Sequence, residues 1–257
     1  LLAAGGTPYC GGTEVLAAMR MGLLAPAALV DLKRVPELAG ISVADSDPAG
    51  ISRADGDLML GARVTHAQVS RSPEVRRHAP LLAAATSQVG NARVRASGTL
   101  AGNICFAEPR SDVLTALLAL QARVELRSAE GARTAPIGEF VQDSFTTSRQ
   151  DTELVSVIQV PKQPAPGAYL RFQPAEYPAV TVAATADPDG CRVVVGAIGG
   201  RPELFSYASV DDVDADAVAE QVEVVADLNG AEDYKRHLAA VFVRRAVAEL
   251  RGSARRV

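Results

Sequence analysis

The stretch GTLAGNICFAEPRSD, residues 98–112, is the most distinctive in the chain and sets the expectations for its fold. Gly98 and Gly102 bracket a short turn that contains Thr99, and the apolar run further on predicts a helix over residues 112–120 with Asp112 as its N-cap. Glycine lets the backbone come close to phosphate oxygens, and successive N–H groups then supply hydrogen-bond donors. We therefore interpret this turn as a candidate anion-binding segment.

A second glycine-rich turn, GGTE at residues 11–14, has the same composition of small and polar residues. Thr13, Thr99 and Asn103 could add side-chain hydrogen bonds to an anion held by the two turns. Neither turn matches the G-x-G-x-x-G fingerprint or the G-x-x-x-x-G-K-[ST] loop, which excludes a Rossmann or P-loop site. Each turn taken alone has the alternative reading of a tight chain connection.

Short β-branched runs alternate with helical stretches around these turns, which predicts mixed α and β structure. Helices are expected at residues 14–22, at 112–120, over the acidic segment 211–227 and at 234–250. Two more are expected to begin at the capping-box pair Thr65 and Gln68 and at residue 80. Strands are expected at residues 28–32, 58–62, 124–126, 154–160, 180–184 and 192–198, the first of them buried. The prolines between residues 161 and 167 indicate a domain boundary.

The composition excludes several classes of protein. The 257 residues carry a net charge of −4, so no overall basic surface points to nucleic acid. No apolar run approaches the roughly 20 residues of a transmembrane helix, and residues 1–6 lack the pattern of a secretory signal, so we expect a cytoplasmic protein. Cys10, Cys105 and Cys191 lie too far apart to suggest a zinc site or a disulfide scaffold. The isolated His66 and His78 are expected at the surface or at helix ends, without a catalytic role.

The segment 98–112, together with VGNARVR at residues 89–95 and the GGTE turn, resembles the flavin-binding medium subunit of the molybdenum hydroxylases. This family includes the carbon monoxide dehydrogenase medium subunit and the FAD domain of xanthine dehydrogenase. The strand expected at 154–160 and the final helix also fit, so the resemblance covers nearly the whole chain.

The resemblance implies an α+β protein with a PCMH-type FAD-binding fold. Two α/β subdomains would hold FAD between them, and a C-terminal domain of antiparallel sheet and helices would follow. For this chain it implies an FAD-binding domain at residues 1–161, split near 45–57, and a C-terminal medium-subunit domain at 162–257.

The same resemblance implies a set of residues that bind the cofactor. They are Gly11, Gly12, Thr13, Glu14, Val15, Thr99, Gly102, Asn103, Ile104, Asp112, Val155 and Tyr177. Asp112 matches the family's acidic residue near the nucleotide end of FAD, and a plain helix cap is the alternative. Tyr177 falls where an aromatic ring approaches the isoalloxazine in some members, and a core tyrosine is the alternative. Ala101 stands where the family usually has glycine.

The function implied is that of a non-covalent FAD-containing electron-transfer subunit, an oxidoreductase without catalytic residues of its own. Electrons would arrive from an iron–sulfur small subunit, which takes them from a molybdenum cofactor in a large subunit. The flavin would pass them to an external acceptor such as NAD, a quinone or oxygen. Two alternatives remain open at this point: a stand-alone FAD-dependent oxidoreductase, and a degenerate, flavin-free scaffold subunit.

Overall fold

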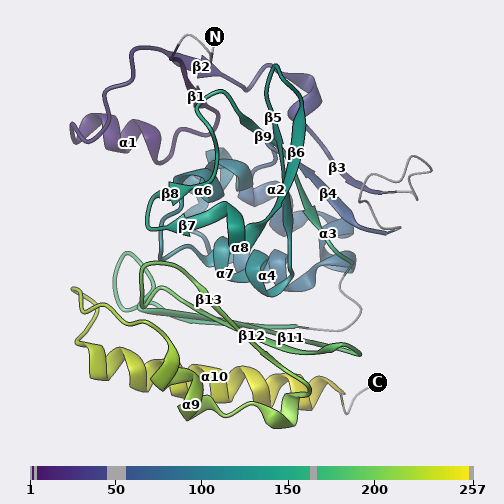
Figure 1. The fold of residues 1–257 in the computed structure, drawn as a ribbon, viewed down its shortest axis with the longest axis vertical. Coiled ribbons are helices and arrows are strands. Elements are labelled where there is room, and N and C mark those ends of the chain that lie inside the picture. Colours follow the sequence, from purple (N-terminus) through teal and green to yellow (C-terminus); the bar gives the residue numbers. More distant parts are fainter. Residues whose placement is uncertain (1, 3–4, 45–55, 163–166, 255–257) are drawn as a thin grey trace.

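The protein is an α+β chain built in layers, seen in a computed structural model that describes residue 2 and residues 5–44, 56–162 and 167–254 (Figure 1). A small N-terminal lobe lies at one end of the molecule, and a five-stranded sheet and a group of helices follow. A four-stranded C-terminal sheet and a last pair of helices complete the structure. The described chain contains no helix long and apolar enough to cross a membrane.

The N-terminal lobe is a single β-α-β unit. It consists of β1 (Thr7–Tyr9), α1 (Val15–Arg20) and β2 (Leu29–Asp31), and the two strands pair in parallel. The predicted helix is confirmed, but the prediction that the strand near residue 30 is buried is wrong, because Leu29 and Asp31 are exposed. In a two-stranded sheet each strand has only one neighbour, so both strands are edge strands. The lobe is followed by a 3-10 turn, Pro36–Leu38.

The second lobe is organised around an antiparallel sheet in the order β3-β4-β9-β5-β6. Its strands are β3 (Ile41–Val43), β4 (Leu58–Gly61), β9 (Leu154–Val160), β5 (Arg123–Arg127) and β6 (Ala132–Pro136). β3 pairs with β4, with Ile41 opposite Leu60, so the chain enters this sheet at residue 41. The subdomain split predicted near 45–57 lies, apart from residues 56 and 57, outside the described residues.

The helices that follow β4 and precede β5 in the sequence bury the first hydrophobic core. They are α2 (His66–Arg71), α3 (Pro73–His78), α4 (Pro80–Gln88), α5 (Ala92–Ser97), α6 (Leu100–Phe106) and α7 (Asp112–Ala119). The capping box of Thr65 and Gln68 is confirmed at the start of α2. A short helix α8 (Ile137–Phe140) leads into the hairpin of β7 (Val141–Asp143) and β8 (Thr146–Thr147).

The C-terminal unit is an antiparallel meander with helices on its outer face. Its strands are β10 (Gly167–Phe172), β11 (Val180–Asp187), β12 (Gly190–Gly196) and β13 (Glu203–Tyr207), paired in that order. Helix α10 (Glu232–Ala254) packs on β10 and β11, and α9 (Ala215–Gln221) packs against α10. The acidic segment 211–227 is helical only in part, because a 3-10 turn at Val210–Asp212 and α9 are its only helical pieces.

Helices α4 and α7 pack on the opposite face of the C-terminal sheet and join it to the second lobe. The predicted N-cap of α7 is wrong by one residue: the Ser111 hydroxyl accepts from the Leu114 N–H at 3.2 Å, and Asp112 begins the helix. The buried Asp112 carboxylate instead accepts from the Tyr169 hydroxyl at 2.6 Å and from the Arg171 guanidinium at 3.1 Å. A serine hydroxyl is as good a cap as a carboxylate, which leaves Asp112 free to link α7 to β10.

Candidate FAD site

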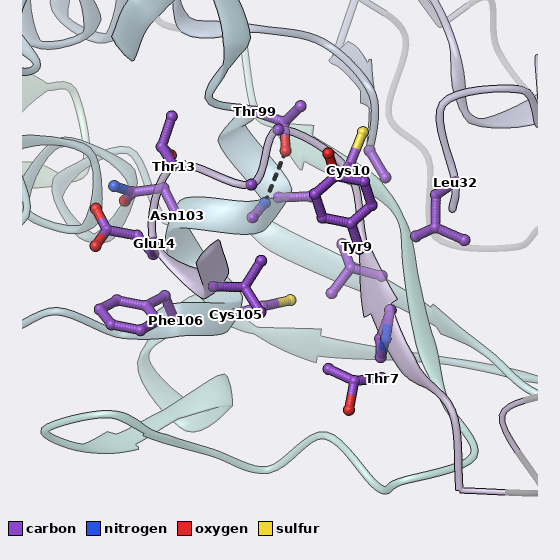
Figure 2. Close-up of a pocket in the computed structure, with 18 of the residues that line it drawn as sticks. Thr7, Tyr9, Cys10, Thr13, Glu14, Leu32, Thr99, Asn103, Cys105 and Phe106 are labelled. Atoms are coloured by element: carbon purple, nitrogen blue, oxygen red, sulfur yellow. Dashed lines mark hydrogen bonds between the residues drawn. The ribbon is translucent and has the colours of Figure 1, made fainter. Parts of the chain in front are cut away.

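A pocket opens between the N-terminal lobe and the second lobe. Its empty space is about 1150 Å³, with the open solvent at its mouth included. The first glycine turn, the first turn of α6 and one end of β9 line it. Figure 2 shows Tyr9, Cys10, Thr13 and Glu14 from the N-terminal lobe facing Thr99 and Asn103 from the second lobe. Two segments almost ninety residues apart in sequence thus form one cavity.

The first glycine turn needs glycine at both positions. Gly12 has φ +73°, a conformation that residues with a side chain rarely adopt. Gly11 packs directly on the second segment, because an added Cβ there would lie 2.3 Å from the Ser97 carbonyl oxygen and 2.8 Å from Gly98 Cα. The crossing of the two segments therefore depends on the bare backbone of Gly11.

The same turn carries a row of unused hydrogen-bond donors. Among the described residues, none of the backbone N–H groups of residues 11–15 donates to another group of the chain. All five of these residues line the pocket. Successive backbone N–H groups without partners in the protein can bind an anion, and a diphosphate offers several acceptor oxygens. The chemistry of this turn therefore fits the diphosphate of FAD.

The second glycine segment differs from its prediction as a turn. Gly98 ends α5, Thr99 caps α6, and Gly102 lies inside the first turn of α6. The Gly102 N–H already donates to Thr99 Oγ1 at 3.0 Å, drawn as the dashed line in Figure 2. The Leu100 N–H donates to the Val64 carbonyl at 2.9 Å. The sequence pattern could not distinguish a glycine turn from a capped helix start, since both favour glycine, threonine and asparagine.

Most of the predicted site residues come together in this pocket. Those that line it are Gly11, Gly12, Thr13, Glu14, Val15, Thr99, Gly102, Asn103 and Val155. Ile104 is instead fully buried in the core of the second lobe. Asp112 lies in the contact with the C-terminal sheet, and Tyr177 stacks under Arg110, whose guanidinium carbon is 4.0 Å from the ring centroid.

Charge is unevenly spread around the pocket. Burial raises the pKa of the Glu14 carboxyl, and the carboxylates of Glu108 and Glu176 raise it further. Arg149, which also lines the pocket, has its guanidinium fixed by the carbonyl of Glu153 at 2.9 Å. The Asp112 carboxyl likewise has a raised pKa, because burial outweighs its bonds to Tyr169 and Arg171.

Sequence reasoning missed several pocket residues, among them Tyr9, His66, Phe106 and Arg149. Tyr9 had a usable signal, because it stands two residues before the glycine turn. The sequence around His66 gave no sign of a pocket, since the neighbouring capping box of Thr65 and Gln68 already accounts for a residue at the start of a helix. It is a helix-end residue as expected, but it is only 2% exposed.

Residues 4–163 match the model of the FAD-binding domain in molybdopterin dehydrogenase, which is more than half of the chain. The chain belongs to this family. It is therefore an FAD-binding oxidoreductase chain, as its resemblance to the molybdenum hydroxylase medium subunits predicted, and the residues that line the pocket fit that cofactor.

Two curated relatives match over almost the whole chain. The nicotine 6-hydroxylase medium subunit of Paenarthrobacter nicotinovorans is 27% identical, over 93% of this chain and 87% of its own length. The carbon monoxide dehydrogenase medium chain of Hydrogenophaga pseudoflava is 28% identical, over 92% and 86%. A solved carbon monoxide dehydrogenase from the same organism has the same fold, with a TM-score of 0.86, 24% identity and coverage of 98% of this chain and 91% of that one.

Proposed function

We propose that this chain is the electron-transfer subunit of a molybdenum hydroxylase-type complex and that the first glycine turn binds the diphosphate of its FAD. The observation that carries the proposal is the set of backbone N–H groups at residues 11–15, which have no partner among the described residues and belong to residues that line the pocket. The remaining predicted contacts follow from their place on the same walls: Thr99, Gly102 and Asn103 from α6, and Val155 from β9.

FAD, when bound, supplies the one- and two-electron chemistry of the subunit. The task of the chain is then to hold and orient it. The turn at residues 11–15 supplies donors without side-chain charge, so the phosphates are bound by groups that cannot change protonation. Asn103 is fixed for its part, because its Oδ1 accepts from the Ser111 hydroxyl at 2.5 Å and leaves the amide N–H groups for a ligand.

We assign the other redox centres of the complex to partner subunits. A ferredoxin-type [2Fe–2S] cluster is held by four cysteine thiolates, and the sequence contains three cysteines, far apart. Within the described ranges no group of three His, Cys, Asp or Glu side chains is placed to hold a metal ion. The relatives are called medium subunit and medium chain, which supports a partner with iron–sulfur clusters and a larger partner with molybdenum. An external acceptor such as NAD, a quinone or oxygen would take the electrons.

Purification with and without co-expressed partners tests the proposal. We expect one FAD per chain, released by acid precipitation because it is not covalently bound. Added anaerobically to the flavin-loaded chain without partners, an organic substrate of the complex should leave the flavin oxidised, and dithionite should bleach it. Rapid bleaching by the substrate alone would support a stand-alone oxidoreductase, and a colourless protein that takes up no FAD would support a scaffold.

A further inference from the structure

Two polar side chains beside the pocket lack a hydrogen-bond partner among the described residues. The Nδ1 atom of His66 is fully buried and unpartnered, in a side chain that borders the pocket. The hydroxyl of Thr13, in the middle of the first glycine turn, also makes no hydrogen bond to the described chain. Thr13 is only half-buried, whereas His66 Nδ1 is fully buried; a buried polar atom without a partner costs about 1–3 kcal/mol, so the histidine calls for an explanation.

Both side chains lie against Gly98. A Cβ built on Gly98 would lie 3.2 Å from His66 Cδ2 and 3.2 Å from Thr13 Oγ1. The φ of Gly98 is −63°, which any residue can adopt, so glycine is needed here for room and not for its backbone conformation. The His66 N–H donates to the Gly98 carbonyl at 3.0 Å, which fixes the start of α2 against this residue.

The imidazole has the right form to pair with a hydroxyl. Burial and, second, the charge of Arg95 lower the pKa of His66 from 6.5 to about 4. The ring is therefore neutral at pH 7, with one N–H and one lone pair. In the structure, Cδ2 is the ring atom that lies beside Gly98. A half-turn about the Cβ–Cγ bond would bring Nδ1 to that place, on the side where Thr13 Oγ1 also lies against Gly98.

We propose that His66 is a positioning residue of the FAD site, whose Nδ1 pairs with Thr13 Oγ1 across Gly98. This bond would tie the first glycine turn to the start of α2 and hold its N–H groups in the shape that receives the diphosphate. His66 would act through Thr13 and not by touching the cofactor. The inference rests on the proposed function of the turn.

The test measures the Kd of the full chain for FAD by flavin fluorescence, together with its thermal unfolding without FAD. In His66→Leu the lost bond should raise the Kd about fivefold to tenfold, the range for one net hydrogen bond. His66→Asn keeps a polar atom near the place of Nδ1 and should restore the Kd to within about threefold of the wild type. The Tm of the FAD-free chain should fall by no more than about 2–4 °C in His66→Leu, since one net hydrogen bond is worth about 1 kcal/mol.

Two further variants separate positioning from a general effect on the fold. In a Thr13→Val background, His66→Leu should change the Kd less than twofold, because the partner is already gone. His78 offers a matched control: its Nδ1 is also buried and unpartnered, but it lies at the end of α3 and does not line the pocket. His78→Leu should leave the Kd unchanged.

The inference is overturned if His66→Leu binds FAD like the wild type, or if it weakens binding equally with and without Thr13→Val. It is also overturned if His78→Leu weakens binding as much as His66→Leu does. A wild-type chain that binds no FAD would instead refute the proposed function, so the two failures can be told apart.

Discussion

The two glycine segments that meet in the pocket use the same residue type for different physical reasons. In the first, Gly12 is required by its φ of +73° and Gly11 by its contact with the backbone of Ser97. In the second, Gly98 has an ordinary φ and provides room, and Gly102 lies inside a helix. The first keeps its N–H groups unbonded, whereas the second uses the N–H groups of Leu100 and Gly102 within the protein.

This difference indicates a division of labour. The first segment is built to bind, because backbone donors left without partners gain most from an anionic ligand. The second segment has a structural role, because the Thr99 cap and the packing of Gly98 hold the start of α6 and the contact with Gly11 in place. The predictions below test this division, in order of the expected change in the free energy of unfolding.

Substitution of Asp112 tests whether this carboxylate contacts FAD or only links α7 to β10. Asp112→Ala removes one partner of a buried ion pair and leaves Tyr169 and Arg171 without their acceptor. The free energy of unfolding should fall by about 3–5 kcal/mol, measured by urea denaturation. Asp112→Asn retains an acceptor for Tyr169 and should cost less. Neither change should alter the Kd for FAD in the protein that remains folded, and a weakened Kd at preserved fold would place Asp112 at the cofactor.

The dependence of stability on pH tests the burial of His66, which lies against Gly98. The pKa of His66 is about 4 in the folded chain against an ordinary 6.5, so the unfolded chain takes up this proton first as the pH falls. Stability present above pH 6.5 is therefore lost between pH 6.5 and 4, by roughly 3 kcal/mol.

The contribution of His66 is isolated by comparing urea denaturation of the wild type and His66→Leu at pH 7 and pH 4.5. Other carboxyl and histidine groups titrate in both proteins, so their effects cancel in the difference. We expect the wild type to lose more stability than the variant on acidification. Equal losses would show that His66 is protonated as easily in the folded chain as in the unfolded one.

Gly11 tests the tight contact in the first segment. In Gly11→Ala the added methyl group would lie 2.3 Å from the Ser97 oxygen, so the two segments must move apart. We expect a loss of about 1–3 kcal/mol in stability and no retained flavin absorbance after gel filtration. Gly252→Ala is the control, since an added Cβ there meets nothing within 4 Å. A Gly11→Ala protein that retains a full complement of FAD would contradict the account of the crossing.

Gly102 should give the smallest change in stability. Its Cβ would meet only the Thr99 Oγ1 atom at 2.9 Å, and alanine in a helix is favoured over glycine by up to about 1 kcal/mol. Gly102→Ala should therefore change the free energy of unfolding by less than about 1 kcal/mol, with a Kd for FAD close to that of the wild type. Gly102→Val should keep its circular dichroism but weaken FAD binding more than tenfold, since its branched side chain fills space beside the pocket. Unchanged affinity in Gly102→Val would remove Gly102 from the site.

The sequence was most informative where one local interaction decides the structure. The capping box at Thr65, the strands around Leu58 and Val155 and the long last helix all follow from local patterns. Prediction failed where a tertiary contact decides. Asp112 was predicted to cap α7, but it bonds Tyr169 and Arg171 on the C-terminal sheet. No pattern in the neighbouring sequence indicates these two partners.

The candidate site follows the same rule. Gly11 and Gly12 could be predicted because a glycine pair beside threonine already suggests a backbone anion site. The buried place of His66 could not, because it depends on the crossing of segments that are far apart in the sequence. The exposure of β2 was equally hidden, since an apolar strand gives no sign of how many neighbours it will have.

The most direct test of the binding role of the first glycine turn is a crystal structure of the chain with FAD bound. The account predicts diphosphate oxygens within about 3.2 Å of several of the backbone nitrogens of residues 11–15, with Gly12 still at positive φ. The start of α6 should remain capped by Thr99 on the other side of the pocket. A diphosphate bound only by residues 99–103, with the N–H groups of residues 11–15 left without a ligand, would contradict it.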